Sequence, residues 1–98
     1  MAYPIDHLRS QFPALASAAV FFDGPGGTQV PQAVLDAVNG YYRSANANEH
    51  GLFATSRRSD EIIGSARQAI ADFINARDAA EIVFGANMTT LTLHLARA

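Results

Sequence analysis

A glycine-rich segment, Asp23-Gly24-Pro25-Gly26-Gly27, restricts the fold of this chain more than any other part of the sequence. Neither a helix nor a strand continues easily through it, because proline has no backbone N–H and glycine favours irregular turns. The preceding run Val20-Phe21-Phe22 is β-branched and aromatic, which predicts a short strand. We therefore expect an N-terminal arm and glycine-rich turn over residues 1–30, followed by a second part over residues 31–98. At 98 residues the whole is a single domain or a piece of one.

Beyond this turn, the spacing of apolar residues predicts three main helices, over about 31–44, 59–76 and 88–98. A short helix is expected over residues 5–12. A second short strand is expected over residues 81–84, because its nearly continuous apolar run is typical of a strand covered on both faces. The chain is thus predicted to be mostly helical, with two short strands.

The helix over 59–76 has the clearest pattern. Ser59 is predicted to be its N-cap, and the carboxylates of Asp60 and Glu61 suit the positive end of the helix dipole. Its predicted apolar stripe consists of Ile62, Ala66, Ile70, Phe73 and Ile74. No glycine, proline or polar cap follows the last helix, so the chain is expected to stop inside it.

Composition excludes several classes of function. The net charge is −2, which offers no electrostatic support for nucleic-acid binding. There is no cysteine, and the three histidines lack metal-site spacing, so no metal site is predicted. No apolar run approaches about 20 residues and the N-terminus has no signal-peptide pattern. We therefore expect a cytoplasmic protein with no membrane partner.

The segment from Phe84 to Thr90 is predicted to run from a strand through a tight turn into a helix N-terminus. Such a start offers unpaired backbone N–H groups and the positive end of a helix dipole, which together favour an anion. Thr89 and Thr90 add hydroxyl groups. The alternative is a helix start that Asn87 caps by itself, with no ligand.

Two other segments also leave alternatives open. The turn over residues 23–28 either lets the backbone approach a ligand closely or simply needs a positive φ angle. The polar loop over residues 46–51, followed by Arg57 and Arg58, places His50 near two guanidinium groups that suit carboxylate binding. The alternative there is a solvated loop leading into a helix.

Together these segments resemble the N-terminal quarter of class V aminotransferase-type enzymes, and above all the cysteine desulfurase-like proteins. The resemblance covers almost the whole chain, with its motifs in the family's order. The segments that carry it are residues 22–28, 31–34, 41–43, 46–51, 56–58, 81–84 and 87–90. It implies an α/β chain that is the N-terminal segment of a fold-type I enzyme dependent on pyridoxal 5′-phosphate (PLP).

The resemblance also implies site residues. The Asn87-Met88-Thr89 turn is similar to the segment that binds the PLP phosphate, where related desulfurases usually have Gly-Thr-Thr. Only Thr89 keeps a hydroxyl side chain at a matching position, whereas backbone binding is unaffected by the change. Gly26 and Thr28 correspond to the stretch over the substrate side of the site. His50 lies on a loop similar to the one that approaches the active site near the dimer interface.

The chain contains no lysine, so it has no side chain that could hold PLP covalently. The family's Schiff-base lysine lies further along the family's chains, and the 98 residues alone are expected to be inactive and to bind no cofactor. Their exposed apolar faces favour self-association as a homodimer. The alternative function is a free-standing, non-catalytic oligomerisation or binding module that keeps this part of the fold.

Overall fold

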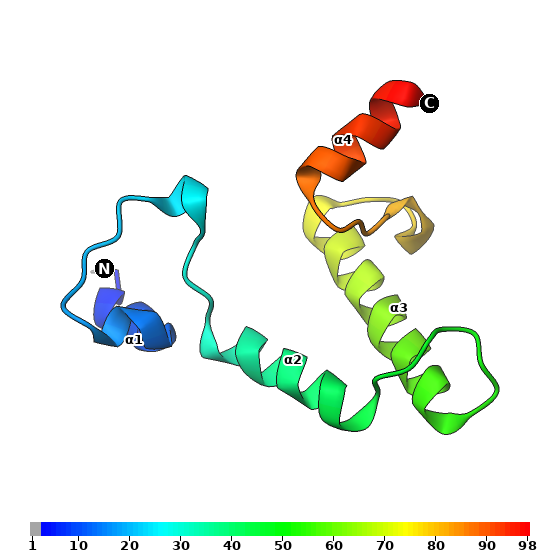
Figure 1. Ribbon diagram of the computed structural model, residues 1–98, viewed down its shortest axis with the longest axis horizontal. Coiled ribbons are helices and arrows are strands. Elements are labelled where there is room, and N and C mark those ends of the chain that lie inside the picture. Colours follow the sequence, from blue (N-terminus) through cyan, green and yellow to red (C-terminus); the bar gives the residue numbers. More distant parts are fainter. Residues whose placement is uncertain (1–2) are drawn as a thin grey trace. The chain divides into compact units, whose positions relative to one another are not determined.

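A computed structural model describes residues 3–98, and these divide into two compact units. The first unit ends at Asn46, and the second runs from Ala47 to Ala98. Within residues 3–98 every regular element is an α-helix or a 3₁₀ helix (Figure 1). None of these helices is both long enough and apolar enough to cross a membrane.

The first unit contains α1 (Ile5–Ser10), two short 3₁₀ turns (Pro13–Ala16 and Gly24–Gly26) and α2 (Gln32–Ser44). The start of α2 is joined to the end of α1, because the Gln32 amide donates a hydrogen bond of 2.8 Å to the Gln11 carbonyl. The helices predicted over 5–12 and 31–44 are therefore confirmed, the first ending two residues early.

The glycine-rich turn forms where it was predicted. Gly27 has a φ of 149°, a backbone conformation that favours glycine. The space around Gly24 and Gly26 is open, and both residues are exposed. The positive φ expected of such a turn is present at Gly27, and the close approach of a ligand stays a prediction.

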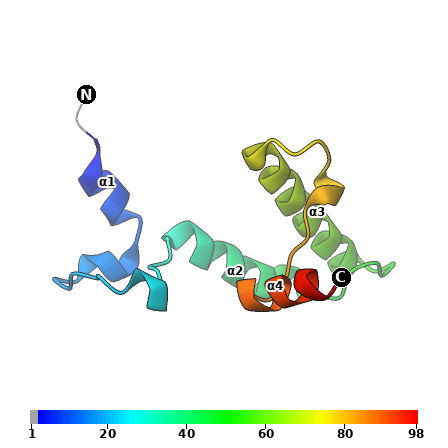
Figure 2. The ribbon, with the colours of Figure 1, turned by 90° about the horizontal axis from the view of Figure 1, so that it is seen from above.

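The second unit contains α3 (Ala54–Ile74), a 3₁₀ turn (Ala79–Glu81) that packs against α3, and α4 (Met88–Arg97) (Figures 1 and 2). The helix α3 begins five residues before its predicted start and ends at Ile74, two residues before its predicted end. Its C-cap residue, Asn75, takes the left-handed conformation typical of a helix C-terminus. The predicted turn at residues 78–80 is confirmed: the Asp78 carboxylate accepts a 2.8 Å hydrogen bond from the Ala80 amide. The prediction of a helix from about residue 88 is confirmed as α4.

The prediction of two short strands is wrong for the described chain. Residues 20–22 are irregular and exposed, and residues 81–84 begin inside a 3₁₀ turn and continue without regular structure. A strand is held by hydrogen bonds to a neighbouring strand, and no partner strand lies among residues 3–98. The mostly helical content is confirmed, but the sheet expected of an α/β chain is not formed by these residues.

Few apolar side chains are buried. Among the described residues, the buried apolar side chains are Ala45 in the first unit and Ala71 and Ile82 in the second. Most of the predicted apolar stripe of α3 is exposed, up to 86% at Phe73, and Leu95 of α4 is 80% exposed. The expected exposure of apolar surface is therefore present.

Candidate functional site

The clearest constellation of polar groups holds the loop of residues 47–52, hereafter loop 47–52, against the first turns of α3. Two fully buried hydroxyls carry much of it. The Ser56 hydroxyl donates to the Asn48 carbonyl and accepts from the Gly51 amide, both at 2.6 Å. The Ser59 hydroxyl donates to the Ala47 carbonyl at 3.0 Å.

This arrangement corrects the prediction that Ser59 is an N-cap. The helix begins at Ala54, so Ser59 already lies inside it, and Phe53 is the N-cap residue without a side-chain capping bond. The Ser59 hydroxyl reaches the returning loop instead of an amide of its own helix. A serine hydroxyl near a helix start either accepts from an amide of its own helix or donates to another backbone group, and the path of the loop decides which of the two bonds forms.

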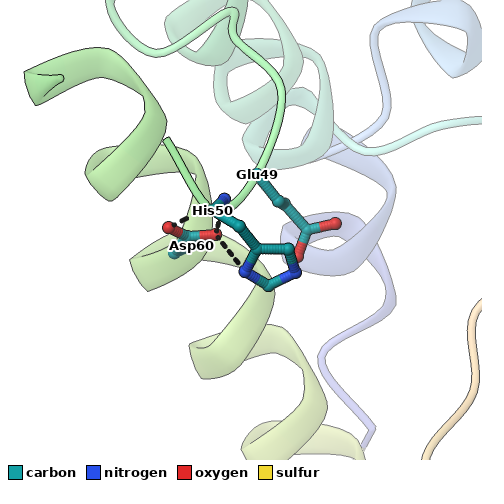
Figure 3. Close-up of side chains that lie close together, drawn as sticks. All are labelled: Glu49, His50 and Asp60. Carbon is teal, nitrogen blue, oxygen red and sulfur yellow. Dashed lines mark hydrogen bonds and ion pairs between the residues drawn. The ribbon is translucent and has the colours of Figure 1, made fainter. Parts of the chain in front are cut away.

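His50 sits at the tip of this loop with its backbone bound to α3. Its φ is 64°, which is unusual for a residue other than glycine. Its amide donates to both carboxylate oxygens of Asp60, at 3.0 and 3.3 Å. Its Nδ1 lies 3.7 Å from Asp60 Oδ1, while the side chain remains 86% exposed (Figure 3). The backbone is thus held while the imidazole faces solvent.

Glu49 completes a group of three potential metal ligands with His50 and Asp60. One ligand atom from each lies within 4.8 Å of the others, and the imidazole lies between the two carboxylates in Figure 3. Sequence reasoning missed this group because Asp60 was assigned only to the helix dipole. Glu49 and His50 are exposed, and the hydrogen bonds of Asp60 explain its position without an ion, so the geometry by itself does not establish a metal site.

Arg57 also serves loop 47–52, because its guanidinium donates to the Leu52 carbonyl. Both arginines of the predicted carboxylate-binding pair are exposed. Arg57 therefore has a structural role in the loop, and Arg58 is the one left facing solvent on this turn of α3.

The predicted anion site lies at the start of α4. The Asn87 side chain accepts a 2.9 Å hydrogen bond from the Thr90 amide and is the N-cap. The amides of Met88 and Thr89 come before the first intrahelical bond, so the helix provides no acceptor for them. Asn87, Met88 and Thr89 are all exposed. Asn87 therefore caps the third amide and leaves the first two facing solvent.

Gly85 shapes this turn because its lack of a side chain leaves room for the side chain of Leu91. A Cβ atom at Gly85 would lie 2.4 Å from Leu91 Cδ2 and 2.6 Å from its Cγ. Leu91 therefore folds back over the turn that precedes α4. Leu91 leaves no space for a side chain at residue 85, so glycine is required here although its φ is not positive.

The candidate residues of the second unit lie at two separate places. Gly26 and Thr28 lie in the first unit and are exposed. Within the second unit, loop 47–52 lies at the N-terminal end of α3, whereas α4 begins beyond its C-terminal end (Figure 1). Among the described residues, neither unit by itself encloses a pocket. Within the second unit, loop 47–52 and the start of α4 are thus separate surface features.

Comparison with known proteins decides the family. A model of the family described as aminotransferase class-V matches residues 20–97. The chain belongs to the aminotransferase class-V family. This confirms the resemblance that residues 22–28 and 87–90 indicated, since the match includes both segments.

Relatives of this class V chain include several cysteine desulfurases. It is 36% identical over 90 residues to a cysteine desulfurase of Serratia proteamaculans (strain 568), covering 86% of this chain and 22% of the relative. It is 34% identical to a probable cysteine desulfurase of Vibrio cholerae, with the same coverage. An uncharacterized protein of Mycobacterium tuberculosis is 36% identical over 98 residues, all of this chain and 24% of the relative. The class V chain therefore spans about a quarter of the length of these relatives.

Proposed function

We propose that this chain is the N-terminal part of a PLP-dependent, cysteine desulfurase-like enzyme that acts on an amino acid. The observation that carries the proposal is the similarity to cysteine desulfurases over 86% of the chain but only 22% of the relatives. The absence of lysine agrees with it, because a PLP enzyme needs a lysine and these 98 residues have none. We expect the 98 residues to be inactive by themselves.

The start of α4 fits one part of this function, the binding of the PLP phosphate. The Met88 and Thr89 amides are the first two of the helix, and the Thr89 hydroxyl adds a third donor. The positive end of the helix dipole favours a phosphate at the same place. Met88 contributes only its backbone, since a thioether is not a hydrogen-bond donor.

When bound, PLP supplies the electron sink that stabilises negative charge developing on an amino-acid substrate. The residues of this chain would bind and orient. Asn87 holds the first turn of α4 in shape by capping the Thr90 amide. His50 would present an imidazole on the substrate side from loop 47–52, and Gly26 and Thr28 would lie on the same side.

The exposed apolar side chains support the same proposal. Phe73 and Ile74 at the end of α3 and Leu95 of α4 are more than half exposed. Surfaces of this kind are normally covered by other protein. We propose that the remainder of the enzyme and a second copy of the chain cover them. The free-standing oligomerisation module would use the same surface for self-association alone.

The reading frame downstream of the gene segment separates these two functions. A continuation that encodes a lysine-containing core supports the enzyme, whereas an immediate stop codon supports the oligomerisation module.

If the frame continues, the whole gene product should be purified with PLP and given cysteine and a thiol reductant. We expect formation of alanine and sulfide, and no turnover by the 98-residue chain. A whole protein that binds PLP but releases neither product would exclude desulfuration, and a screen of other amino acids would then test transamination and epimerisation.

A further inference from the structure

Loop 47–52 is held by α3 to an unusual extent for a surface loop. Five backbone groups in six residues are bound by four α3 side chains: Ser56, Arg57, Ser59 and Asp60. Two of these side chains, Ser56 and Ser59, are fully buried beneath the loop. Polar groups in such a position are stable only when hydrogen bonded, so the first turns of α3 and the loop depend on one another.

The loop is also closely packed at its centre. A Cβ atom at Gly51 would lie 2.5 Å from Phe53 Cε1 and 2.9 Å from Ser56 Oγ. The preceding residue, His50, is held at a φ of 64° by the bond from its amide to Asp60. A non-glycine residue in the left-handed region has to be held there by its surroundings. The backbone of residues 50 and 51 therefore has little freedom.

The side chain of His50 contrasts with this constrained backbone. It is 86% exposed, and its partner among residues 3–98 is the Asp60 carboxylate, 3.7 Å from Nδ1. Packing of the loop does not require the imidazole, although the loop determines where it is presented. A fixed backbone reduces the entropy lost when such a side chain meets a ligand.

We propose that Ser56 and Asp60 are positioning residues, which hold loop 47–52 so that His50 meets the amino-acid substrate in a fixed place. This inference rests on the proposed function, since it assigns His50 to the substrate side. It goes further in naming the α3 residues that act through His50. Ser56 fixes the loop through Asn48 and Gly51, and Asp60 fixes the amide of His50 itself.

The first test measures the loop in the whole gene product with PLP bound. Ser56→Ala and Asp60→Ala each remove one set of hydrogen bonds. Ser65→Ala and Asp72→Ala are matched controls, because both residues are exposed and lie further along α3. Hydrogen exchange of the peptide covering loop 47–52 should become about tenfold faster in the two test variants and stay unchanged in the controls. Unchanged exchange in the test variants would overturn the inference. If Ser56→Ala does not fold, Asp60→Ala carries the test, because its side chain is a third exposed.

The second test asks whether Ser56 acts through His50. We expect Ser56→Ala and His50→Ala each to raise KM for cysteine about tenfold with little change in kcat. The double variant should show no further increase, because the two changes remove the same contribution. Effects that multiply in the double variant would overturn positioning through His50. No PLP-dependent turnover by the unaltered protein would instead overturn the proposed function and, with it, the substrate role, while hydrogen exchange judges the loop anchoring separately.

Discussion

At the scale of single residues, two small polar side chains of α3 are completely buried. Ser56 and Ser59 are both 0% exposed, whereas large apolar side chains of the same helix face solvent. Each serine is tolerated there because its hydroxyl has a hydrogen-bond partner in loop 47–52. The local stability of the loop therefore depends on hydrogen bonds and close backbone contact more than on apolar burial.

Gly51 allows the close approach between loop and helix, so Gly51→Ala should destabilise the chain. The new Cβ would meet Phe53 and Ser56, and the Ser56 hydroxyl cannot move without losing two bonds. We expect the free energy of unfolding to fall by about 1–3 kcal/mol in urea titrations. Gly64→Ala is the control: the space around Gly64 is open and it lies inside α3, so stability should rise by about 0.5–1 kcal/mol. Equal effects of the two substitutions would contradict this account.

At the scale of elements, α2 and α4 form as predicted because their sequence signals are local. The predicted strands do not form among residues 3–98, because a strand needs a partner strand. Asn87 caps α4 through a residue three positions away, and this spacing is visible in the sequence. The predicted strands at 20–22 and 81–84 have no strand to pair with in the part of the chain that the structure describes. A pattern of apolar residues indicates a tendency to form a strand, but the hydrogen bonds of a sheet come from elsewhere in the fold.

The first turn of α4 should bind phosphate weakly even without the rest of the enzyme. The Met88 and Thr89 amides and the Thr89 hydroxyl are the donors, and the helix dipole contributes about 0.3–1 kcal/mol. Water competes freely at an exposed turn, so we expect a Kd of about 1 mM, near −4 kcal/mol. Amide NMR during a phosphate titration should show shifts confined to about residues 85–91.

Two substitutions on α4 provide the comparison for this titration. Thr89→Ala should weaken phosphate binding about threefold to tenfold by removing one donor, whereas Thr92→Ala, beyond the first turn, should leave it unchanged. Shifts that gather at the arginines, or no shifts at about 10 mM phosphate, would show that Asn87 merely caps a helix that binds no anion.

At the scale of the whole molecule, apolar surface exceeds what the chain can bury. Among residues 3–98 the first unit buries one apolar side chain, Ala45, and the second buries Ala71 and Ile82, while Phe73 and Leu95 are at least 80% exposed. Protein surfaces with such side chains normally meet another surface. The stability of the chain is therefore expected to depend on what covers these faces.

We expect the 98-residue chain to form at least a dimer at tens of micromolar. Burial of Phe73, Ile74 and Leu95 against a second copy would remove apolar area from water. Sedimentation velocity should show the larger species, and Phe73→Ser combined with Leu95→Ser should shift it toward monomer. Arg67→Ser, a change of a charged exposed residue on α3, is the control and should not. A clean monomer of the unaltered chain at these concentrations would contradict the prediction.

The absence of lysine leads to a separate prediction about PLP. After incubation with PLP and reduction by borohydride, the 98-residue chain should carry no pyridoxyl group on any side chain. Peptide mass spectrometry checks this, and labelling of the terminal amine is disregarded. In the whole gene product, the label should appear on a lysine outside these residues. A side-chain adduct within the 98 residues would disprove the prediction.

The sequence by itself was sufficient for the features that depend on nearby residues or on long motifs. These are α2, α4 with its Asn87 cap, the glycine-rich turn over residues 23–28, the turn at Asp78 and membership of the class V family. Only the tertiary structure decided that α3 begins at Ala54, that Ser59 binds the Ala47 carbonyl, and that Asp60 holds His50. Those hydrogen bonds join residues ten and twelve positions apart through a loop that turns back on its own helix. No periodicity or local propensity encodes that path, because it results from the loop's backbone groups finding partners on α3 as they leave water.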